Sequence, residues 1–123
     1  MPKRPRAADV EPLLPLKPLV FQVLLALADG ERHGWALVRD VQVRGGFTRI
    51  MPGNFYRTLR AMLADGLIEE SSERREFREE DDERRRYFQL TPLGLAVAVE
   101  EAKRLESVLL EARAKRLLPK SRS

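Results

Sequence analysis

The sequence contains no cysteine and a single histidine, and these two absences remove most metal and nucleophile chemistry. Without cysteine there is no disulfide, thiolate zinc site, iron–sulfur cluster or cysteine nucleophile. His33 has only Asp29 and Glu31 as close carboxylates, where the pattern predicts a helix end, so we expect no metal and no cofactor. Phosphate-binding GxxxxGK[ST] and GxGxxG loops are missing, and no histidine is available to activate a serine. We therefore expect no enzyme and no catalytic residues.

Long hydrophobic runs are also lacking. The longest, Leu19 to Ala28, is interrupted by Gln22 and falls short of the roughly 20 residues that span a bilayer. No hydrophobic signal segment follows the basic residues between Met1 and Arg6. The sequence therefore predicts a cytoplasmic protein with no membrane contact.

The composition fits one globular domain. The chain has 123 residues, of which 43% are hydrophobic and 34% are charged. Basic residues number 23 and acidic residues 19, which gives a net charge of +4. Such a balance predicts a hydrated surface around one core.

The first half of the chain reads as an arm followed by three helices. Residues 1–17 form a flexible, proline-rich, basic arm with little helix, because proline fixes φ and removes a backbone donor. Apolar residues then recur at three- and four-residue spacing over 18–28, 34–43 and 52–65. Pro52 opens the third helix, and Gly66 stands where a left-handed C-terminal cap is expected.

The second half reads as a β-hairpin and a long helix. Two short strands, 67–71 and 86–90, flank an almost entirely charged segment. Thr91 and Pro92 then open a helix over 92–117, and a flexible basic tail covers 118–123. The fold class is mainly α with a small β-hairpin: a winged helix-turn-helix over 18–91, followed by a long C-terminal dimerisation helix.

In this fold the third helix enters the DNA major groove. Between Arg49 and Arg60 there are three arginines and no acid, as a surface facing phosphates requires. The candidate base-contacting residues share one helix face at i, i+3 and i+4: Asn54, Arg57 and Thr58. Arg49 and Arg60 are candidate phosphate contacts. An ordinary solvated helix face is the alternative for this patch.

Four ordered segments resemble the PadR family of transcriptional regulators. Its patterns are of HGY, SPGTLYxxLxxLxxxGLI and RRYYxLTxxG type, and the match covers about residues 19–116. The matching runs here are His33-Gly34-Trp35-Ala36-Leu37, Met51-Pro52-Gly53-Asn54-Phe55-Tyr56-Arg57-Thr58-Leu59-Arg60, Asp65-Gly66-Leu67-Ile68 and Arg85-Arg86-Tyr87-Phe88-Gln89-Leu90-Thr91-Pro92-Leu93-Gly94. The resemblance implies a bacterial, homodimeric winged-helix repressor that binds double-stranded DNA and is often relieved by a small molecule or by stress.

Some positions depart from the family pattern. Met51 replaces the usual serine and cannot cap a helix, and Asn54 replaces the usual threonine, so the operator preference is open. Trp35 stands at the tyrosine of the HGY segment. Tyr56 occupies the family's recognition-helix tyrosine, for which phosphate contact and half-buried packing are the two interpretations.

The charged segment between the strands departs most. Glu73 to Arg86 holds six arginines against seven acids, a net charge of −1. The acidic tip repels phosphate and reads as a solvated loop, whereas the flanking arginines are candidate phosphate contacts: Arg74, Arg75 and Arg78.

The helix over 92–117 supplies a candidate dimer interface. Its apolar seam repeats at 3-4-3-4-3 spacing and comprises Leu95, Ala98, Ala102, Leu105, Leu109 and Ala112. A small trihelical core cannot cover a helix this long, so a second copy is expected, although packing on the chain's own first helix is compatible with it. Two-fold symmetry then predicts an inverted-repeat operator.

Two aromatic residues, Phe21 and Trp35, can form a flat wall of an effector pocket for a small apolar molecule, or can simply pack in the core.

The favoured function is a sequence-specific, dimeric DNA-binding regulator. The alternative, consistent with the acidic wing and Met51, is a winged-helix protein-interaction module without DNA binding.

Overall fold

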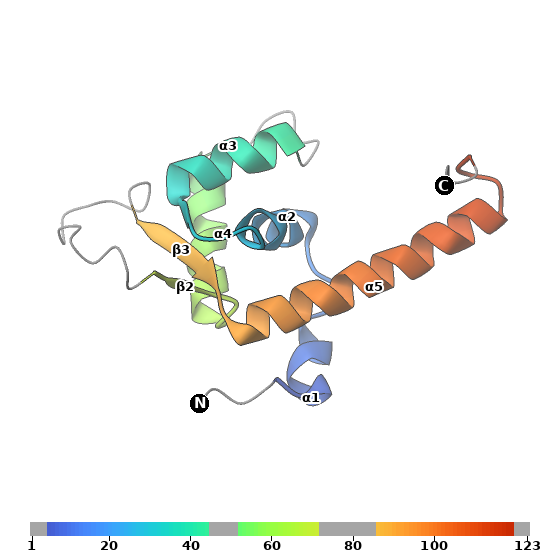
Figure 1. Ribbon diagram of the computed structural model, residues 1–123, viewed down its shortest axis with the longest axis horizontal. Coiled ribbons are helices and arrows are strands. Elements are labelled where there is room, and N and C mark those ends of the chain that lie inside the picture. The colour runs from blue at the N-terminus through green and yellow to red at the C-terminus, as the bar shows by residue number, and fades with distance from the viewer. Residues whose placement is uncertain (1–4, 45–51, 72–85, 120–123) are drawn as a thin grey trace.

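The computed structural model describes residues 5–44, 52–71 and 86–119. Figure 1 shows a cluster of helices with a small sheet at one side and a long last helix that projects away from it. In chain order the elements are α1 (Ala7–Val10), the 3-10 turn η1 (Glu11–Leu13), α2 (Pro18–Leu27), β1 (Arg32–His33), α3 (Gly34–Arg44), α4 (Pro52–Ala64), β2 (Ile68–Glu70), β3 (Tyr87–Leu90) and α5 (Pro92–Ala114). The expected class, mainly helical with a small antiparallel sheet and a long C-terminal helix, is confirmed.

Helices α2, α3 and α4 pack around one hydrophobic core. Each helix turns its apolar residues, spaced three or four apart, to a single face. The buried side chains are Val23, Leu24 and Leu27 from α2, Leu37 and Val41 from α3, and Phe55, Leu59 and Met62 from α4. The three helices predicted over 18–28, 34–43 and 52–65 are confirmed to within one residue at each end.

The sheet has three strands where the sequence predicted two. β1 lies beside β3, which gives the antiparallel order β1-β3-β2. Arg32 faces Phe88 and His33 faces Tyr87 across this pair. The sequence pattern predicted no strand at Arg32 and His33. A two-residue strand is too short to show an alternating pattern, and its pairing depends on a strand far along the chain.

The two predicted strands of the hairpin are present and slightly shorter than expected. Ile68 lies opposite Leu90 and Glu70 opposite Phe88. Ile68 and Phe88 are buried against the helices, whereas Glu69, on the opposite face of β2, is exposed. The sheet therefore covers one end of the helical core with its apolar face and presents charged residues outward.

The start of α5 is fastened to the junction between α4 and β2. Gly66 ends α4 with a φ of 78°, the left-handed cap that the sequence predicted. Thr91 caps α5: its hydroxyl accepts from the Gly94 N–H at 2.9 Å and donates to the Gly66 carbonyl at 2.5 Å. The Thr91 N–H also donates to the Leu67 carbonyl at 3.2 Å. These bonds make the end of α4 and the beginning of α5 one structural unit.

Replacing the Thr91 hydroxyl should weaken this junction. We expect T91A to lower the free energy of unfolding by about 1–2 kcal/mol, because it removes a helix cap and leaves the Gly66 carbonyl without its partner. Urea denaturation followed by circular dichroism measures the loss. T91S keeps the hydroxyl and should remain within about 0.5 kcal/mol of the parent chain. Equal losses in T91A and T91S would assign the effect to the methyl group instead.

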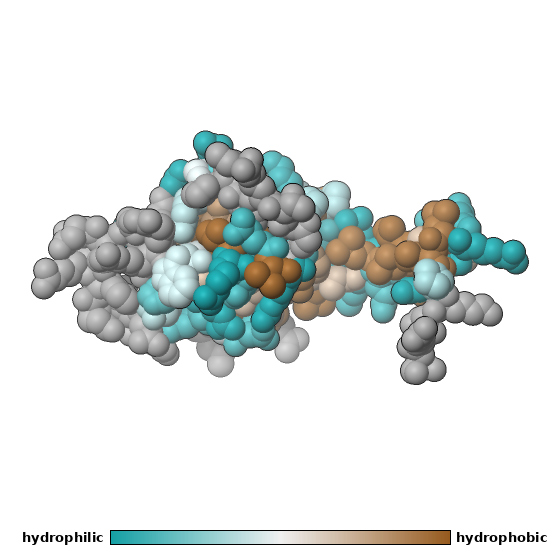
Figure 2. Space-filling view, turned by 90° about the horizontal axis from the view of Figure 1, so that it is seen from above, coloured by the Kyte–Doolittle hydropathy of each residue, from teal (hydrophilic) through white to brown (hydrophobic). Residues whose placement is uncertain are grey.

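Helix α5 packs on α2, α1 and β3 with its first half. Val97 is fully buried in the core, and Glu101 is a buried charged residue whose exposed fraction is 2%. Arg104 holds the Glu101 carboxylate through two hydrogen bonds of 2.7 and 2.8 Å. The second half of the helix projects beyond the helical core, and apolar residues mark it along its length (Figure 2).

The segment 1–17 differs from the expected arm with little helix. Two short helical elements, α1 and η1, occupy its described part, and Val10 is buried in the core. Pro12 lies in the first turn of η1, where a missing backbone donor costs nothing, so proline did not prevent a turn here. The Leu16 N–H also donates to the Glu101 carboxylate, which ties the end of the arm to α5.

Among the described helices, none combines the length and the apolar character needed to cross a membrane. No group of three or more histidine, aspartate or glutamate side chains capable of holding a metal ion occurs within residues 5–44, 52–71 and 86–119.

Candidate nucleic-acid interface

Helix α4 has one buried face and one exposed, basic face. Phe55 and Leu59 are completely buried, which fixes the helix on the core. On the opposite side Asn54, Arg57 and Arg60 are exposed. No acidic residue occurs between Pro52 and Ala64. The helix therefore presents an amide and two guanidinium groups to solvent from a rigid support, without a carboxylate to repel phosphate.

The predicted base-contacting triad lies on adjacent turns of this helix. Asn54 and Arg57 are exposed, and Thr58 is half-buried. The Thr58 hydroxyl donates to the Asn54 carbonyl at 3.0 Å. This bond uses the hydroxyl hydrogen, so in this state Thr58 offers an acceptor oxygen and a methyl group rather than a donor. Its role as a contact of bases or phosphates stays a prediction.

Tyr56 lies at the border between the two faces of α4. It is half-buried, and its ring meets the Phe55 ring edge-on, with centroids 5.5 Å apart and an interplanar angle of 87°. This geometry is typical of a favourable aromatic pair. The ring packs at the edge of the core while part of the side chain stays accessible, and its contact with phosphate stays a prediction.

Four of the expected phosphate contacts lie outside the described residues: Arg49, Arg74, Arg75 and Arg78. At the base of the hairpin, Arg86 pairs with Glu70 at 3.2 Å. Gln89 donates to the Glu69 carboxylate at 2.9 Å. Each of these two acidic side chains on β2 therefore has a polar partner, either on β3 or in the residue just before it, as cross-strand pairing favours.

Trp35 and Phe21, the candidate effector-pocket residues, lie on different helices. Trp35 is 47% exposed on α3, with the Arg39 guanidinium 5.2 Å from its ring centroid. Its ring also stacks on His33 at 5.7 Å, and His33 in turn contacts Tyr87 at 3.7 Å. Phe21 is half-buried on α2. The tryptophan thus joins α3 to the sheet, and the effector pocket stays a prediction.

Half of the predicted dimer seam is exposed in the single chain. Leu95 and Leu109 are 53% and 44% exposed, and Ala102 is exposed between them. Ala98, Leu105 and Ala112 are half-buried. Val99, which lies on the same side as Leu95, is 44% exposed. An apolar strip therefore remains uncovered along α5.

Sequence reasoning missed two residues that hold α5 in place, namely Gly94 and Glu101. Gly94 approaches the Leu67 backbone so closely that an added Cβ would lie 2.0 Å from the Leu67 oxygen. The sequence signal for Gly94 was its position shortly after Thr91-Pro92, in the last of the four segments that resemble the PadR family. Glu101 carried no signal, because it is one of several charged residues in a charge-rich helix.

Comparison with known proteins agrees with the fold. Residues 23–100 match the PadR-like family of transcriptional regulators. The transcriptional regulator Rv3488 of Mycobacterium tuberculosis is 36% identical over 91 residues, which cover 74% of this chain and 78% of that protein.

Solved structures share the fold. A PadR-like regulator from Bacillus cereus superposes with a TM-score of 0.60 at 20% identity, covering 94% of this chain and all of the other. A PadR family regulator from Clostridium difficile gives a TM-score of 0.59 at 21% identity, covering 84% of this chain and 100% of the other. With the winged-helix architecture and the family match over most of its length, the chain belongs to the PadR-like family of transcriptional regulators.

Proposed function

We propose that this DNA-binding regulator is a repressor that acts as a homodimer on an inverted-repeat operator. Helix α4 inserts into the major groove, with Asn54, Arg57 and Thr58 nearest the bases. The phosphate contacts are Tyr56, Arg60 and the arginines outside the described residues, Arg49, Arg74, Arg75 and Arg78. The observation that carries the proposal is the exposed, acid-free basic face of α4, opposite a fully buried apolar face.

The homodimer is supported by the uncovered apolar strip of α5. Leu95, Ala102 and Leu109 are exposed, with Ala98, Leu105 and Ala112 beside them. Removing this strip from water favours association, since burial of apolar surface contributes roughly 25 cal/mol per Å². A two-fold axis would set the two α4 helices about 34–36 Å apart, one turn of the DNA helix.

Charge removal on α4 tests the DNA contacts. We expect R57Q to weaken binding to the selected operator at least tenfold and to relax base preference, because a guanidinium that contacts guanine contributes about 1–3 kcal/mol of discrimination. R60Q should weaken binding to all duplexes alike and reduce the slope of log affinity against log salt by about 1. Fluorescence anisotropy over a salt series, after selection from random duplex DNA, measures both quantities.

The matched control is K103Q, which removes one exposed positive charge from α5, where Lys103 pairs with Glu100 at 3.2 Å. This variant should bind DNA within about twofold of the parent chain. If R57Q and R60Q behaved like K103Q, α4 would not be the DNA-reading helix. An enriched sequence without two-fold symmetry would contradict the homodimer.

A further inference from the structure

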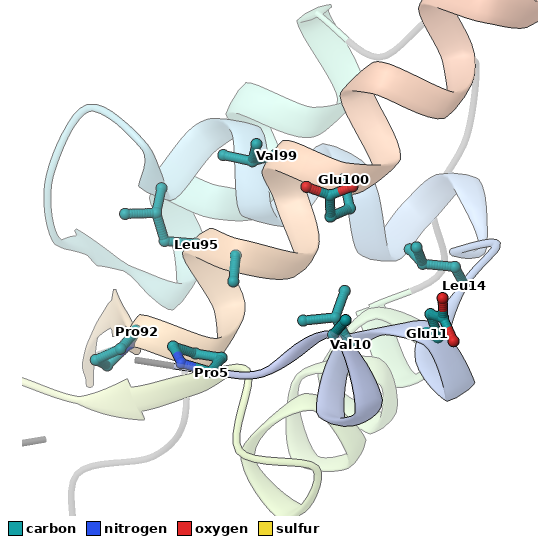
Figure 3. Close-up of a pocket in the computed structure, with 10 residues that line it drawn as sticks. Pro5, Val10, Glu11, Leu14, Pro92, Leu95, Val99 and Glu100 are labelled. Carbon is teal, nitrogen blue, oxygen red and sulfur yellow. The ribbon is translucent and has the colours of Figure 1, made fainter. Parts of the chain in front are cut away.

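The groove between the N-terminal arm and α5 adjoins the proposed dimer interface. It encloses a cavity of about 620 Å³. Val10 and Leu14 line it from the arm, and Leu95 and Val99 line it from α5 (Figure 3). Leu95 also belongs to the apolar strip that supports the homodimer. The polar contacts around β1 belong neither to this interface nor to the exposed face of α4, and the proposed function leaves them without a role.

The segment around β1, residues 31–34, is bonded to both ends of the connection between β2 and β3. Ser71 is the last described residue before this connection, and Arg86 is the first described residue after it. The Ser71 hydroxyl donates to the Glu31 carboxylate, and the Gly34 N–H donates to the Arg86 carbonyl at 3.0 Å. The segment therefore holds the base of the hairpin on both sides.

The same segment is joined to α3. Helix α3 follows β1 without a connecting residue, and Figure 1 shows it beginning beside the sheet. Arg32 pairs with Asp40 of α3 at 3.7 Å. The His33 ring contacts the rings of Tyr87 on β3 and Trp35 on α3, with centroid distances of 3.7 and 5.7 Å. Because α3 and α4 form the helix-turn-helix, these contacts connect the hairpin to the helix pair of the DNA-binding fold.

The bond between Ser71 and Glu31 has a buried donor. Ser71 is buried and Glu31 is half-buried, and the two residues lie 40 positions apart in the chain. A buried hydroxyl needs a partner, and an ionised carboxylate is a strong acceptor. The bond therefore fixes the chain just after β2 against the loop that precedes β1.

We infer that Glu31 is a positioning residue for DNA binding. Through Ser71 it holds the base of the hairpin in a fixed place relative to α3 and α4, which lets the hairpin and α4 contact one DNA duplex together. The inference rests on the proposed function, in which Arg74, Arg75 and Arg78 contact phosphates. Arg74 follows Ser71 by three residues, so the chain between them spans at most roughly 10 Å. The reach of Arg74 to a phosphate therefore depends on where Ser71 is held.

Two single substitutions test this role, and one of them leaves the net charge unchanged. S71A removes the donor of the bond, and E31A removes the acceptor. We expect each to weaken binding to the selected operator at least about fivefold and to reduce the slope of log affinity against log salt by about 1, because a phosphate contact is lost. Fluorescence anisotropy over a salt series measures both quantities. Unfolding of part of the protein lowers the active concentration without changing this slope, so the slope separates positioning from a purely structural role.

E69A is the matched control for charge, because Glu69 is an exposed carboxylate of the same sheet, bonded to Gln89. Removing an acid near phosphates favours DNA binding by charge alone, so E69A should bind within about twofold of the parent chain or more tightly. E31Q retains an oxygen that can accept from Ser71, and it should lose less affinity than E31A. Urea denaturation followed by circular dichroism checks that each variant is folded under the binding conditions.

The double variant S71A/E31A tests whether the two residues act through one bond. It should bind within about twofold of the weaker single variant, because the second substitution then removes nothing further. If the two losses multiplied instead, Glu31 would act by a route other than Ser71, and the inference would be overturned.

The outcomes distinguish this inference from the proposed function. If R57Q lost the operator while S71A and E31A bound like E69A, the proposed function would stand and the inference would be wrong. Equal losses in E31A and E31Q would assign the effect to the charge of Glu31, which also overturns the inference. If the parent chain bound no duplex in a salt-dependent manner, the proposed function and the inference would both be lost.

Discussion

Gly94→Ala is expected to unfold the protein or to lower its free energy of unfolding by about 4 kcal/mol or more. The added methyl carbon would lie 2.0 Å from the Leu67 carbonyl oxygen and 3.0 Å from its carbon. Both are backbone atoms, so no side chain can rotate away. Leu67 is also held by the Thr91 N–H and by its own bond to Met62, so α5 would have to move off the junction. Overpacking with backbone displacement is among the costliest single changes in a folded domain.

Urea and thermal denaturation followed by circular dichroism measure this loss. Gly53 provides a matched control, because in the part of the chain that the structure describes no atom lies within 4 Å of an added Cβ there. G53A should stabilise α4 by about 0.5–1 kcal/mol, since alanine favours a helix over glycine. A G94A variant as stable as G53A would show that the close approach of α5 to β2 is absent in solution.

Glu101→Gln is expected to lower the free energy of unfolding by about 2 kcal/mol at neutral pH. The carboxylate is buried, and it accepts two hydrogen bonds from Arg104 and one from the Leu16 N–H. A neutral amide keeps the volume but loses the charge and at least one acceptor. Because the bond from Leu16 tethers the arm, E101Q should also expose the arm to proteolysis earlier than the parent chain.

The effect of E101Q should depend on pH. The hydrogen bonds from Arg104 lower the pKa of Glu101 below its ordinary value of 4.5, against the opposing effect of burial and with the help of the Leu16 N–H. A carboxyl group whose pKa is lowered on folding stabilises the protein fully above that ordinary value. This contribution disappears as the pH falls through the lowered pKa. The stability difference between the parent chain and E101Q should therefore be largest near neutrality and shrink below about pH 4.5.

Urea denaturation at a series of pH values measures this difference. E106Q, a substitution at an exposed glutamate of the same helix, serves as the control and should change stability by less than about 0.5 kcal/mol. A constant difference between the parent chain and E101Q over the whole pH range would mean that packing, rather than the ionised carboxylate, carries the effect.

Periodic patterns allowed α2, α3 and α4 to be predicted almost to the residue. Phe55, Leu59 and Met62 on α4 are spaced as a buried face requires, and Gly66 marks where that helix stops. The exposed basic face followed directly, since the residues between the buried ones have to point outward. Local sequence thus determines both the helix and its exposed basic side.

Features that depend on contacts between distant segments could not be predicted. β1 consists of two residues that pair with β3 in the sheet that the structure describes. The arm is rich in proline, yet Val10 joins the core because α5 offers an apolar surface beside it. Glu101 resembles its charged neighbours in sequence, and only its position against the arm makes it buried. Each of these depends on a partner segment far along the chain, which no local pattern encodes.

In a homodimer, the junction at Thr91 and Gly94 would make the operator spacing depend on the angle between the two copies. Because the start of α5 is bonded to Gly66 and Leu67, α4 and α5 rotate together. Helix α5 is about 34 Å long, so a tilt of roughly 10° at the junction moves its far end by about 6 Å. In a homodimer joined through α5, such a tilt would change the distance between the two α4 helices by a similar amount, away from the spacing of about 34–36 Å that one turn of DNA requires. A molecule that changed the angle between the two copies of α5 would therefore alter DNA binding without contacting α4.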